Sequence, residues 1–248
     1  MGFASEDVEE RFALARTVEL VHDVLFFKLG CDKYELFITG KGNYRNDIAK
    51  TAPYKGNRKD MKKPVHYQAI RNQLVEMGAV VVDDMEADDA IAIEATKLGD
   101  NCIIVSIDKD LDQIPGHHYN FVKGEEYYVT PEEGLKNFYK QILTGDRVDN
   151  IIGIKGCGPV KAEKLISPCK TEKEMFDVCV KAYNDDGQNG VERVTENAHL
   201  LWLLRHPNQH YQVPSNSQDL IGQLSTEPTS VSTDDVIPTP KQSSSEKE

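Results

Sequence analysis

Three short acidic clusters contain the residues whose types and spacing could bind divalent cations. Their members are Glu86, Asp88 and Asp89, then Asp108 and Asp110, and finally Asp146 and Asp149. Carboxylate oxygens without nearby His or Cys are the ligands that Mg²⁺ or Mn²⁺ prefers. Each cluster also has an ordinary explanation, because acids are favoured at helix N-termini and in exposed loops. The coincidence of the first two clusters on neighbouring strand ends favours the metal interpretation.

A basic stretch precedes the acidic clusters along the chain. Residues 41–71 contain nine Lys or Arg side chains against two acids, whereas residues 83–112 contain ten acids against two lysines. Lys55 and Arg58 lie three residues apart beside Tyr54, a spacing that can clamp a phosphate, and Arg45 is a weaker candidate on the same argument. The net charge of −12 argues against general nucleic-acid binding. A positive strip beside dense carboxylates instead indicates an enzyme that holds a polyanion over bound cations.

A glycine-rich turn forms a second candidate contact for a polyanion. Residues 153–158 lead into Pro159, which opens a helix, so that free backbone N–H groups would face an anion. The candidate binding residues are Lys155, Gly156, Gly158, Lys161 and Lys164. This is the pattern of a helix-hairpin-helix, which binds the phosphate backbone of DNA without reading its bases.

The elements that must position these residues follow from hydrophobic periodicity and from Gly and Pro punctuation. In the first half we expect helices at 6–29, 65–77 and 87–98 and strands at 36–38, 79–82 and 102–107. This order predicts an α/β fold with a mostly parallel sheet flanked by helices, whose strand ends would bring the first two acidic clusters together. His117 and His118 are expected in a surface turn.

After residue 130 the pattern changes to helices alone, expected at 131–143, 159–166, 171–183 and 191–205. We therefore divide the chain into an α/β core (1–130) and a helical subdomain (131–206) with the hairpin at about 146–166. The Ser-, Thr- and Pro-rich segment 207–248 is expected to be disordered, because it has too few apolar residues to offset its ordering entropy.

Several classes of protein are excluded by composition. No apolar run approaches the ~18 residues that a membrane-spanning helix needs, and the N-terminus lacks the pattern of a secretory signal. The five cysteines include no Cys-x-x-Cys pair, which indicates reduced thiols rather than disulfides or a zinc site. We expect a cytoplasmic monomer with no membrane partner, in the host cytoplasm if the protein is viral.

The motifs resemble those of the 5′→3′ exonuclease and flap endonuclease family, most closely its bacteriophage members. The matching segments are EADDAIA (86–92), SIDKDLDQIPG (106–116), TGDRVDN (144–150), GIKGCGPVKAEKLI (153–166) and PYKGNRK (53–59). The resemblance covers about residues 5–205. It implies a PIN-like nuclease core, a two-metal hydrolysis of DNA near a 5′ end or flap with RNA–DNA hybrid as a further substrate, and a role in DNA replication.

The resemblance also implies roles for single residues. Glu86 and Asp88 match ligands of a first Mg²⁺ or Mn²⁺ ion, Asp108, Asp110 and Asp149 match ligands of a second, and Asp89 and Asp146 match residues that hold metal-bound waters. Tyr54, Lys55 and Arg58 match residues that stack on or grip the scissile nucleotide. The family's hairpin binds a monovalent cation, so K⁺ is expected near residues 153–158.

Two departures from the family pattern concern the first metal. Family members begin with a buried strand carrying a metal-binding Asp, which this sequence lacks, and a further Asp is replaced at Thr39. We therefore expect the chain to be a fragment with weak cleavage. Two alternatives stay open: a DNA-structure-binding protein whose catalysis has lapsed, and a related metal-dependent RNase.

Overall fold

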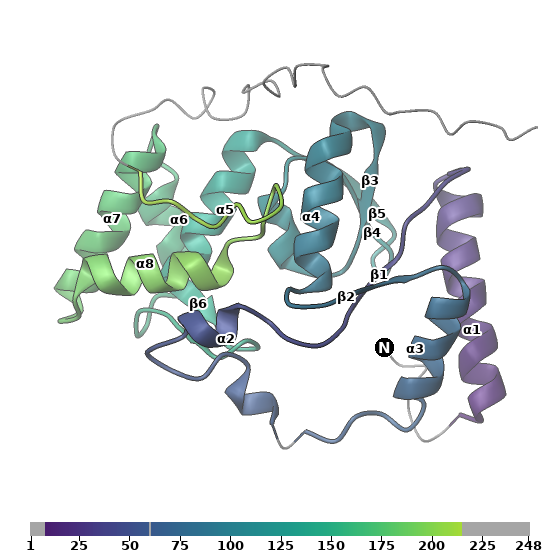
Figure 1. Cartoon of the computed structure of the whole chain (residues 1–248). Helices are drawn as coiled ribbons and strands as arrows, with labels where there is room; N and C mark the ends of the chain where they lie inside the picture. The colour runs from purple at the N-terminus through teal and green to yellow at the C-terminus, as the bar shows by residue number, and fades with distance from the viewer. Residues whose placement is uncertain (1–7, 60, 215–248) are drawn as a thin grey trace, which may run out of the picture.

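The computed structural model describes residues 8–59 and 61–214. In the first half, helices α1 (Glu10–His22), α2 (Arg45–Ile48), α3 (Tyr67–Glu76) and α4 (Ala87–Leu98) alternate with strands β1 (Phe37–Thr39), β2 (Val80–Val82) and β3 (Ile103–Val105). These are the expected elements, with the short α2 added in the basic stretch. Figure 1 shows α1 and α3 at one end of the molecule, with α4 and the strands in the middle.

The predicted α/β class is confirmed, but the strands form separate small sheets. β1 pairs with β2 in parallel, with Ile38 opposite Val81. β3 pairs in parallel with β4 (Gly116–Asn120), which pairs antiparallel with β5 (Glu125–Val129). In the described part of the chain, β1 and β3 therefore each leave one edge without a strand partner.

The β4–β5 hairpin corrects the expectation of a surface turn at His117 and His118. His118 is only 2% exposed, its Nε2 lies 2.8 Å from the carbonyl of Ile114, and its ring stacks on Tyr127. Burial lowers the pKa of His118. The strands were missed because His, Tyr and Asn look polar in a pattern of hydrophobic alternation, although aromatic faces pack well on a sheet.

The expected long first helix is interrupted. α1 ends at His22 and continues as a π-helical segment, Asp23–Lys28, before Gly30 adopts a positive φ of 63°. The change of period turns Val24 and Leu25 inward, where both are buried. Ala13 of α1 packs on Ile70 of α3, so this pair of helices forms a small core of its own.

The second half is helical, as expected. α5 (Pro131–Thr144) is followed by the short pair β6 (Gly145–Asp146) and β7 (Ile151–Ile152), then by α6 (Pro159–Ile166), α7 (Glu172–Asp185) and α8 (Gly190–Leu201). Thr130 and Glu133 form a capping box at the start of α5. The largest core lies here, where Phe138 and Ile142 of α5 meet Met175 of α7 and Ala198 of α8. No helix in residues 8–59 or 61–214 is long and apolar enough to cross a membrane.

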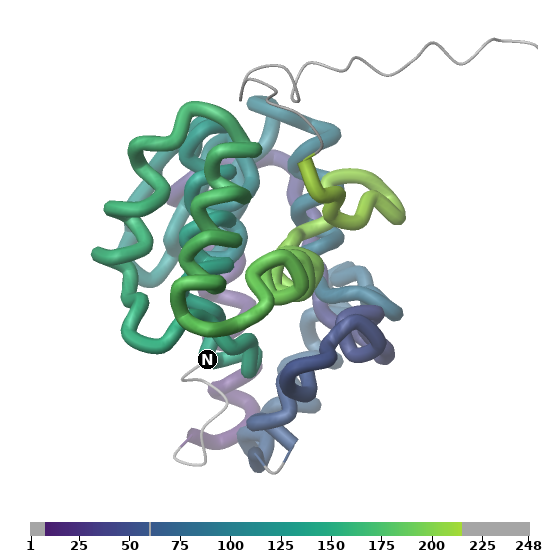
Figure 2. The backbone as a smooth tube through the Cα atoms, turned by 90° about the vertical axis from the view of Figure 1, so that its left-hand side faces the viewer, coloured from purple at the N-terminus to yellow at the C-terminus, as the bar shows by residue number. Residues whose placement is uncertain are grey.

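α8 ends four residues earlier than expected because tertiary hydrogen bonds replace helical ones. Arg45 donates to the carbonyls of Leu200 and Trp202, and the Leu204 N–H donates to Asp89. In Figure 2, which views the helical end, α8 points toward the viewer with the segment containing α2 beside it.

The segment after α8 corrects the expected boundary of the disordered tail. Tyr211 is only 4% exposed, its ring lies 5.5 Å from that of Phe138, and its hydroxyl is 2.9 Å from that of Tyr139. Residues 207–214 are therefore part of the folded structure, whereas residues 215–248 lie outside the described range. The polar composition of residues 207–248 predicted disorder for the whole segment, although Tyr211 within it is buried.

Candidate active site

The N-terminus of α4 carries the first acidic cluster. Glu86 is the N-cap, and it forms a capping box with Asp89, in which each side chain accepts the backbone N–H of the other residue. Thr39, at the end of β1, accepts the N–H of Ala87 through its hydroxyl, at 3.0 Å. The loop after β2 thus delivers Glu86 to the edge of the sheet predicted from the sequence.

Glu86 and Asp149 meet around the basic stretch. The Lys55 ammonium forms a short ion pair with Glu86 and lies 3.5 Å from Oδ2 of Asp149. The Tyr54 hydroxyl is 3.1 Å from Glu86 and 2.9 Å from Asp149, and the Arg58 guanidinium is 2.6 Å from Asp149. The structure therefore brings together five of the residues singled out in the sequence.

The basic stretch reaches this place because it docks on the turn before β7. The backbone N–H of Lys55 donates to the carbonyl of Asp149, and Arg58 donates through Nε to the carbonyl of Val148. Lys55 adopts a left-handed backbone conformation, with φ of 53°, to make this contact. Tyr54 is only 8% exposed, so in this conformation its hydroxyl serves the site while its ring is not free to stack on a base, contrary to expectation.

A second group of carboxylates lies beside the first. Asp108 follows β3 and accepts the N–H of Asp110 at 3.0 Å. The Gln141 amide on α5 donates to Asp110 at 2.6 Å and to Asp146 at 3.4 Å. Asp88 is close enough to this group to be affected by the charges of Asp108 and Asp110. Acids from α4, the β3 end and the β6 turn are therefore neighbours.

The charges of this second group are poorly compensated. Burial, followed by the charges of Asp108 and Glu86, raises the pKa of Asp88 to about 7. Burial, followed by Asp108 and Asp146, raises the pKa of Asp110 to about 7. Such shifts mark a place where protons or cations must offset repulsion between carboxylates.

Asp146 and Asp149 have different electrostatic environments. Although burial opposes it, the Lys109 ammonium at 3.1 Å and two backbone N–H groups hold the pKa of Asp146 below its usual value. Burial raises the pKa of Asp149, against the effects of Lys55, Tyr54 and Arg58. Asp146 thus caps its own turn, the ordinary role considered for it, while also facing the second group.

The positions of Asp89 and Arg45 are incompatible with their predicted roles, which are to hold a metal-bound water and to contact DNA. The Asp89 side chain is 0% exposed, and Arg45 binds both its oxygens, at 2.6 and 2.8 Å. Arg45 is itself only 1% exposed. Asp89 therefore cannot present a free oxygen to a metal-bound water, and Arg45 cannot reach DNA in this conformation. The pair was misjudged because its partners come from distant parts of the sequence.

The donor chemistry fits Mg²⁺ or Mn²⁺, but the present arrangement is closed by basic side chains. In the part of the chain that the structure describes, no three Asp, Glu, His or Cys side chains are gathered closely enough to hold an ion as they stand. Lys55 and Arg58 supply the positive charge between Glu86 and Asp149. An ion at that point would exchange places with the Lys55 ammonium.

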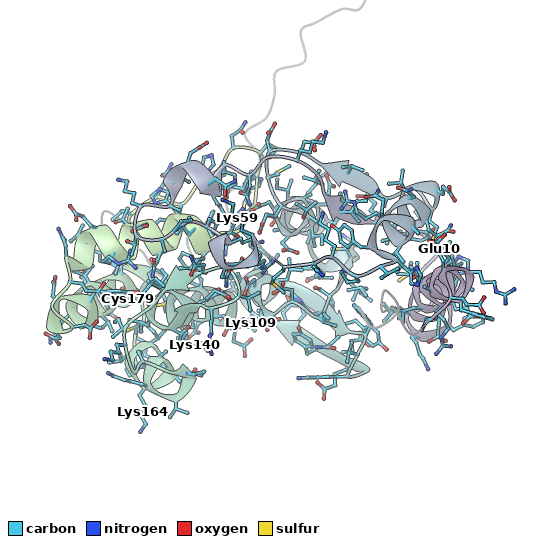
Figure 3. All side chains as sticks on the ribbon, turned by 90° about the horizontal axis from the view of Figure 1, so that it is seen from below. Glu10, Lys59, Lys109, Lys140, Lys164 and Cys179 are labelled. Atoms are coloured by element: carbon cyan, nitrogen blue, oxygen red, sulfur yellow. The ribbon has the colours of Figure 1, made fainter. Side chains whose placement is uncertain are left out.

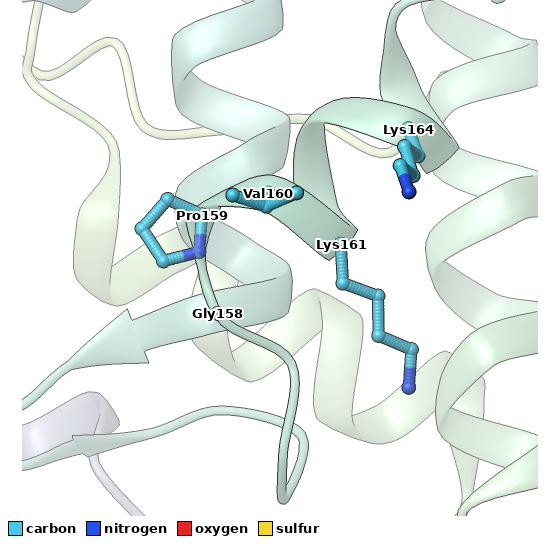
Figure 4. A pocket seen from close by; sticks show the side chains of 5 residues that line it. All are labelled: Gly158, Pro159, Val160, Lys161 and Lys164. Atoms are coloured by element: carbon cyan, nitrogen blue, oxygen red, sulfur yellow. The ribbon is translucent and has the colours of Figure 1, made fainter.

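The glycine-rich turn and the start of α6 carry exposed lysines, apart from the acidic groups. A hollow of about 370 Å³ is lined by Gly158, Pro159, Val160, Lys161 and Lys164 at the start of α6. Lys155 and Gly156 precede it, and Gly156 has a positive φ of 70°. Figure 3 shows Lys164 near the helical end and Lys109 over the middle of the molecule. Two lysines and a helix start at one hollow suit a phosphate.

Two polar side chains that sequence patterns do not single out also contact the acids. Asn43 donates to Glu86 at 3.0 Å, and Gln141 joins Asp110 to Asp146. Gln141 lies one turn before the TGDRVDN segment, on the inner face of α5, and this position is the only signal that could have found it. Asn43 follows Gly42 in an irregular segment and has no periodic signal.

Residues 33–140 match the model of the 5'-3' exonuclease N-terminal, resolvase-like domain. Residues 33–140 are thus similar to the N-terminal domain of 5'-3' exonucleases. The matched range contains Tyr54, Lys55, Arg58, Glu86 and Asp110, whereas Asp149 and the glycine-rich turn at residues 153–158 follow it along the chain.

Curated proteins that are similar to this chain come from bacteria and a phage. The "Exonuclease" of Escherichia phage T7 is 27% identical over 71% of this chain and 57% of its own length. The "5'-3' exonuclease" of Buchnera aphidicola is 33% identical over 57% of this chain and 54% of its own, and "Flap endonuclease Xni" of Shewanella woodyi is 32% identical over 50% and 55%. The chain spans little more than half the length of these relatives.

Solved structures share the exonuclease fold. A T5 5'-exonuclease structure with bound divalent zinc has a TM-score of 0.56 at 18% identity and covers 76% of this chain and 80% of its own. A bacteriophage T5 D15 flap endonuclease complex with DNA and metal ions has a TM-score of 0.54 at 17% identity, over 79% and 80%. The expected family strand carrying an Asp has no counterpart among residues 8–59 and 61–214, where β1 and β3 keep their free edges.

Proposed function

We propose that this protein is a divalent-metal-dependent 5′→3′ exonuclease or structure-specific 5′ nuclease, which hydrolyses DNA phosphodiesters near a 5′ end or flap. The observation that carries the proposal is the meeting of Glu86 and Asp149 around Lys55 and Arg58, beside the poorly compensated group of Asp88, Asp108 and Asp110. Anionic ligands next to phosphate-binding cations are what hydrolysis of a phosphodiester requires.

The proposed ligands divide into two groups that share Asp88. We assign Glu86, Asp88 and Asp149 to one Mg²⁺ or Mn²⁺ ion and Asp88, Asp108 and Asp110 to another. This differs from the family expectation for Asp149, and its support is the contact of Asp149 with Tyr54 and Lys55, which also touch Glu86. Two ions would lower the pKa of the attacking water and stabilise charge on the phosphate.

The protein's own groups would bind and orient the substrate. When Lys55 and Arg58 leave the carboxylates, the ammonium and the guanidinium become free to bind the phosphates of the strand to be cut. Backbone N–H groups at the start of α6, with Lys161 and Lys164, would hold the duplex backbone, and carbonyls of residues 153–158 would hold K⁺. We place this activity in the cytoplasm and in DNA replication, with an RNA–DNA hybrid as a further substrate.

Cleavage of defined substrates tests the proposal. A 5′-labelled duplex, a 5′-flap DNA and an RNA–DNA hybrid are each incubated with the protein in Mg²⁺, Mn²⁺ or EDTA. We expect metal-dependent release of short 5′ products, which Asp149→Asn abolishes while DNA affinity stays equal or rises, because one repulsive charge is lost. Asp47→Asn, at an exposed acid, is the matched control. Cleavage by Asp149→Asn at the wild-type rate would show that Asp149 is not part of the site.

A second candidate function is binding of DNA structures without cleavage. The observation that favours it is the incomplete set of acids for the first metal, since Thr39 stands where the family pattern has a further Asp. Tight binding of 5′-flap DNA in EDTA, with no product in either metal after removal of contaminating nucleases, would establish this function instead. Cleavage restricted to RNA would point to the RNase alternative.

A further inference from the structure

The carboxylate of Glu196, on α8, fastens the beginning of the basic stretch. Oε1 accepts the backbone N–H groups of Lys50 and Thr51, both at 2.7 Å, and Oε2 accepts the Thr51 hydroxyl at 2.6 Å. Although burial opposes it, these bonds from Thr51 and Lys50 hold the pKa of Glu196 below its usual value. A carboxylate with so many donors is a fixed anchor rather than a mobile surface acid.

A neighbouring side chain on α8 fastens the segment that leads into the hairpin. Arg193 donates to the carbonyl of Ile152 at 2.8 Å, and it also bonds the Thr51 hydroxyl and pairs with Glu196. Asn197 donates to the same Ile152 carbonyl at 2.9 Å. Ile152 is the last residue of β7, immediately before the glycine-rich turn.

One face of α8 therefore holds two segments that are far apart in the sequence. The segment at Thr51 leads within four residues to Tyr54 and Lys55, and the segment at Ile152 leads directly into the hairpin. Under the proposed function, on which this inference rests, the first segment binds the strand to be cut and the second binds the duplex. A connection between them fixes how far apart the two contacts lie.

We propose that Glu196 and Arg193 are positioning residues that set the distance between the duplex contact and the cleavage point. Successive nucleotides are separated by about 3.4 Å along one strand, so a displacement of a few ångströms at Thr51 moves the cut by one nucleotide. The basic stretch has other ties, since Asn150 donates to the carbonyl of Pro53 and the Lys55 N–H donates to Asp149. Loss of Glu196 therefore shifts or broadens the cut rather than abolishing it.

The test compares Glu196→Ala, Glu196→Gln and Glu192→Ala, the last a control at an exposed acid on the same helix. Products of a 5′-flap DNA are resolved to single nucleotides, and the hydroxyl-radical footprint of each protein on the same DNA is mapped without divalent metal. Amide hydrogen exchange of Lys50 and Thr51 and the melting temperature are measured in parallel.

We expect Glu196→Ala to raise exchange at Lys50 and Thr51 at least tenfold and to move or spread the cleavage and footprint boundaries by at least one nucleotide. Glu196→Gln keeps an oxygen that accepts both N–H groups but loses the pairing with Arg193, so it should restore part of the exchange protection and bring the boundaries back toward those of wild type. Glu192→Ala should behave as wild type.

Two results would overturn the inference. Unchanged exchange in Glu196→Ala would show that the tether does not hold Lys50 and Thr51, and raised exchange with unchanged boundaries would show that the tether does not set position. The footprint needs no cleavage, so a wild-type protein that does not cut DNA defeats the proposed nuclease activity while the footprint still decides this inference. The melting temperature and the rescue by Glu196→Gln distinguish the loss of this tether from a general loss of stability.

Discussion

Arg45 holds Asp89 by two hydrogen bonds, at 2.6 and 2.8 Å, and the two side chains are 1% and 0% exposed. The same guanidinium donates to the carbonyls of Leu200 and Trp202. A single buried ion pair thus joins α2, the start of α4 and the end of α8. Because Asp89 also caps Glu86, the pair supports the candidate site without belonging to it.

Arg45→Leu should lower the free energy of unfolding by about 3–5 kcal/mol, because it leaves the Asp89 carboxylate buried without a partner. Arg11→Leu is the matched control, since Arg11 pairs with Glu9 on the surface, where such a pair contributes about 0–1 kcal/mol. Urea unfolding monitored by circular dichroism measures both changes. Equal stabilities of the two variants would contradict the role given to Arg45.

The raised pKa of Asp88 predicts a dependence of stability on pH in the absence of metal. Asp88 binds its proton up to about pH 7 when folded but only to about 3.8 when unfolded, so the stability that this proton contributes is present below pH 4 and is lost as pH rises through 7. Asp88→Asn should therefore melt at a higher temperature than wild type at pH 8 in EDTA, with little difference at pH 4.

Scanning calorimetry from pH 4 to 8 measures this effect, and the comparison is repeated with Mg²⁺. Bound cations should raise the melting temperature of wild type more than that of Asp88→Asn, because they relieve the repulsion that Asn removes. Asp47→Asn should show neither effect. Parallel curves for wild type and Asp88→Asn across this pH range would contradict the raised pKa.

Lys161→Ala with Lys164→Ala should weaken binding to all duplex sequences about equally and should reduce the slope of affinity against salt by ~0.9 for each lost phosphate contact. Both lysines line the hollow at the start of α6. Lys173→Ala with Lys181→Ala on α7 makes the same change of net charge away from the hollow. Fluorescence anisotropy in EDTA at several salt concentrations compares the DNA affinities of the two double variants. Equal losses of affinity would show that only the overall charge matters.

Tyr211→Ala should lower the free energy of unfolding by about 3–5 kcal/mol, the usual effect of removing a buried aromatic ring. In a chain of this size the melting temperature would fall by about 2–4 °C for each kcal/mol. Gln212→Ala, at the exposed neighbouring residue, should change little. A Tyr211→Ala protein as stable as wild type would show that the segment after α8 does not contribute to the core.

The parts of the fold that the sequence predicted well are fixed by local signals. α4 was expected at residues 87–98 and α6 at residues 159–166, and both have these bounds. Acidic residues favour the start of α4, Pro159 begins α6, and Gly99 ends α4 with a positive φ. Each signal lies within a few residues of the boundary that it determines, so a single sequence is enough.

The errors arise where contacts between distant residues decide the outcome. Asp89 has the residue type and spacing of a metal-site acid, but Arg45, 44 residues earlier, takes both its oxygens. Tyr211 stands in a polar segment, and only the distant Phe138 and Tyr139 give it a place in the core. The convergence of the clusters at residues 86–89 and 108–110 was predicted because strand ends meet at one edge of a sheet, but the meeting of Glu86 with Asp149 around Lys55 was not.

Under the proposed function, the ammonium of Lys55 would give the site a threshold for metal. Lys55 neutralises Glu86 and lies beside Asp149, so an incoming ion competes with a counter-charge that is covalently tethered and cannot be diluted away. When free Mg²⁺ is scarce, the carboxylates of the site would remain paired with Lys55 and their charge would be balanced. A displaced Lys55 at the mouth of the site would then attract the phosphates of an incoming strand, so that metal loading and substrate capture would reinforce each other.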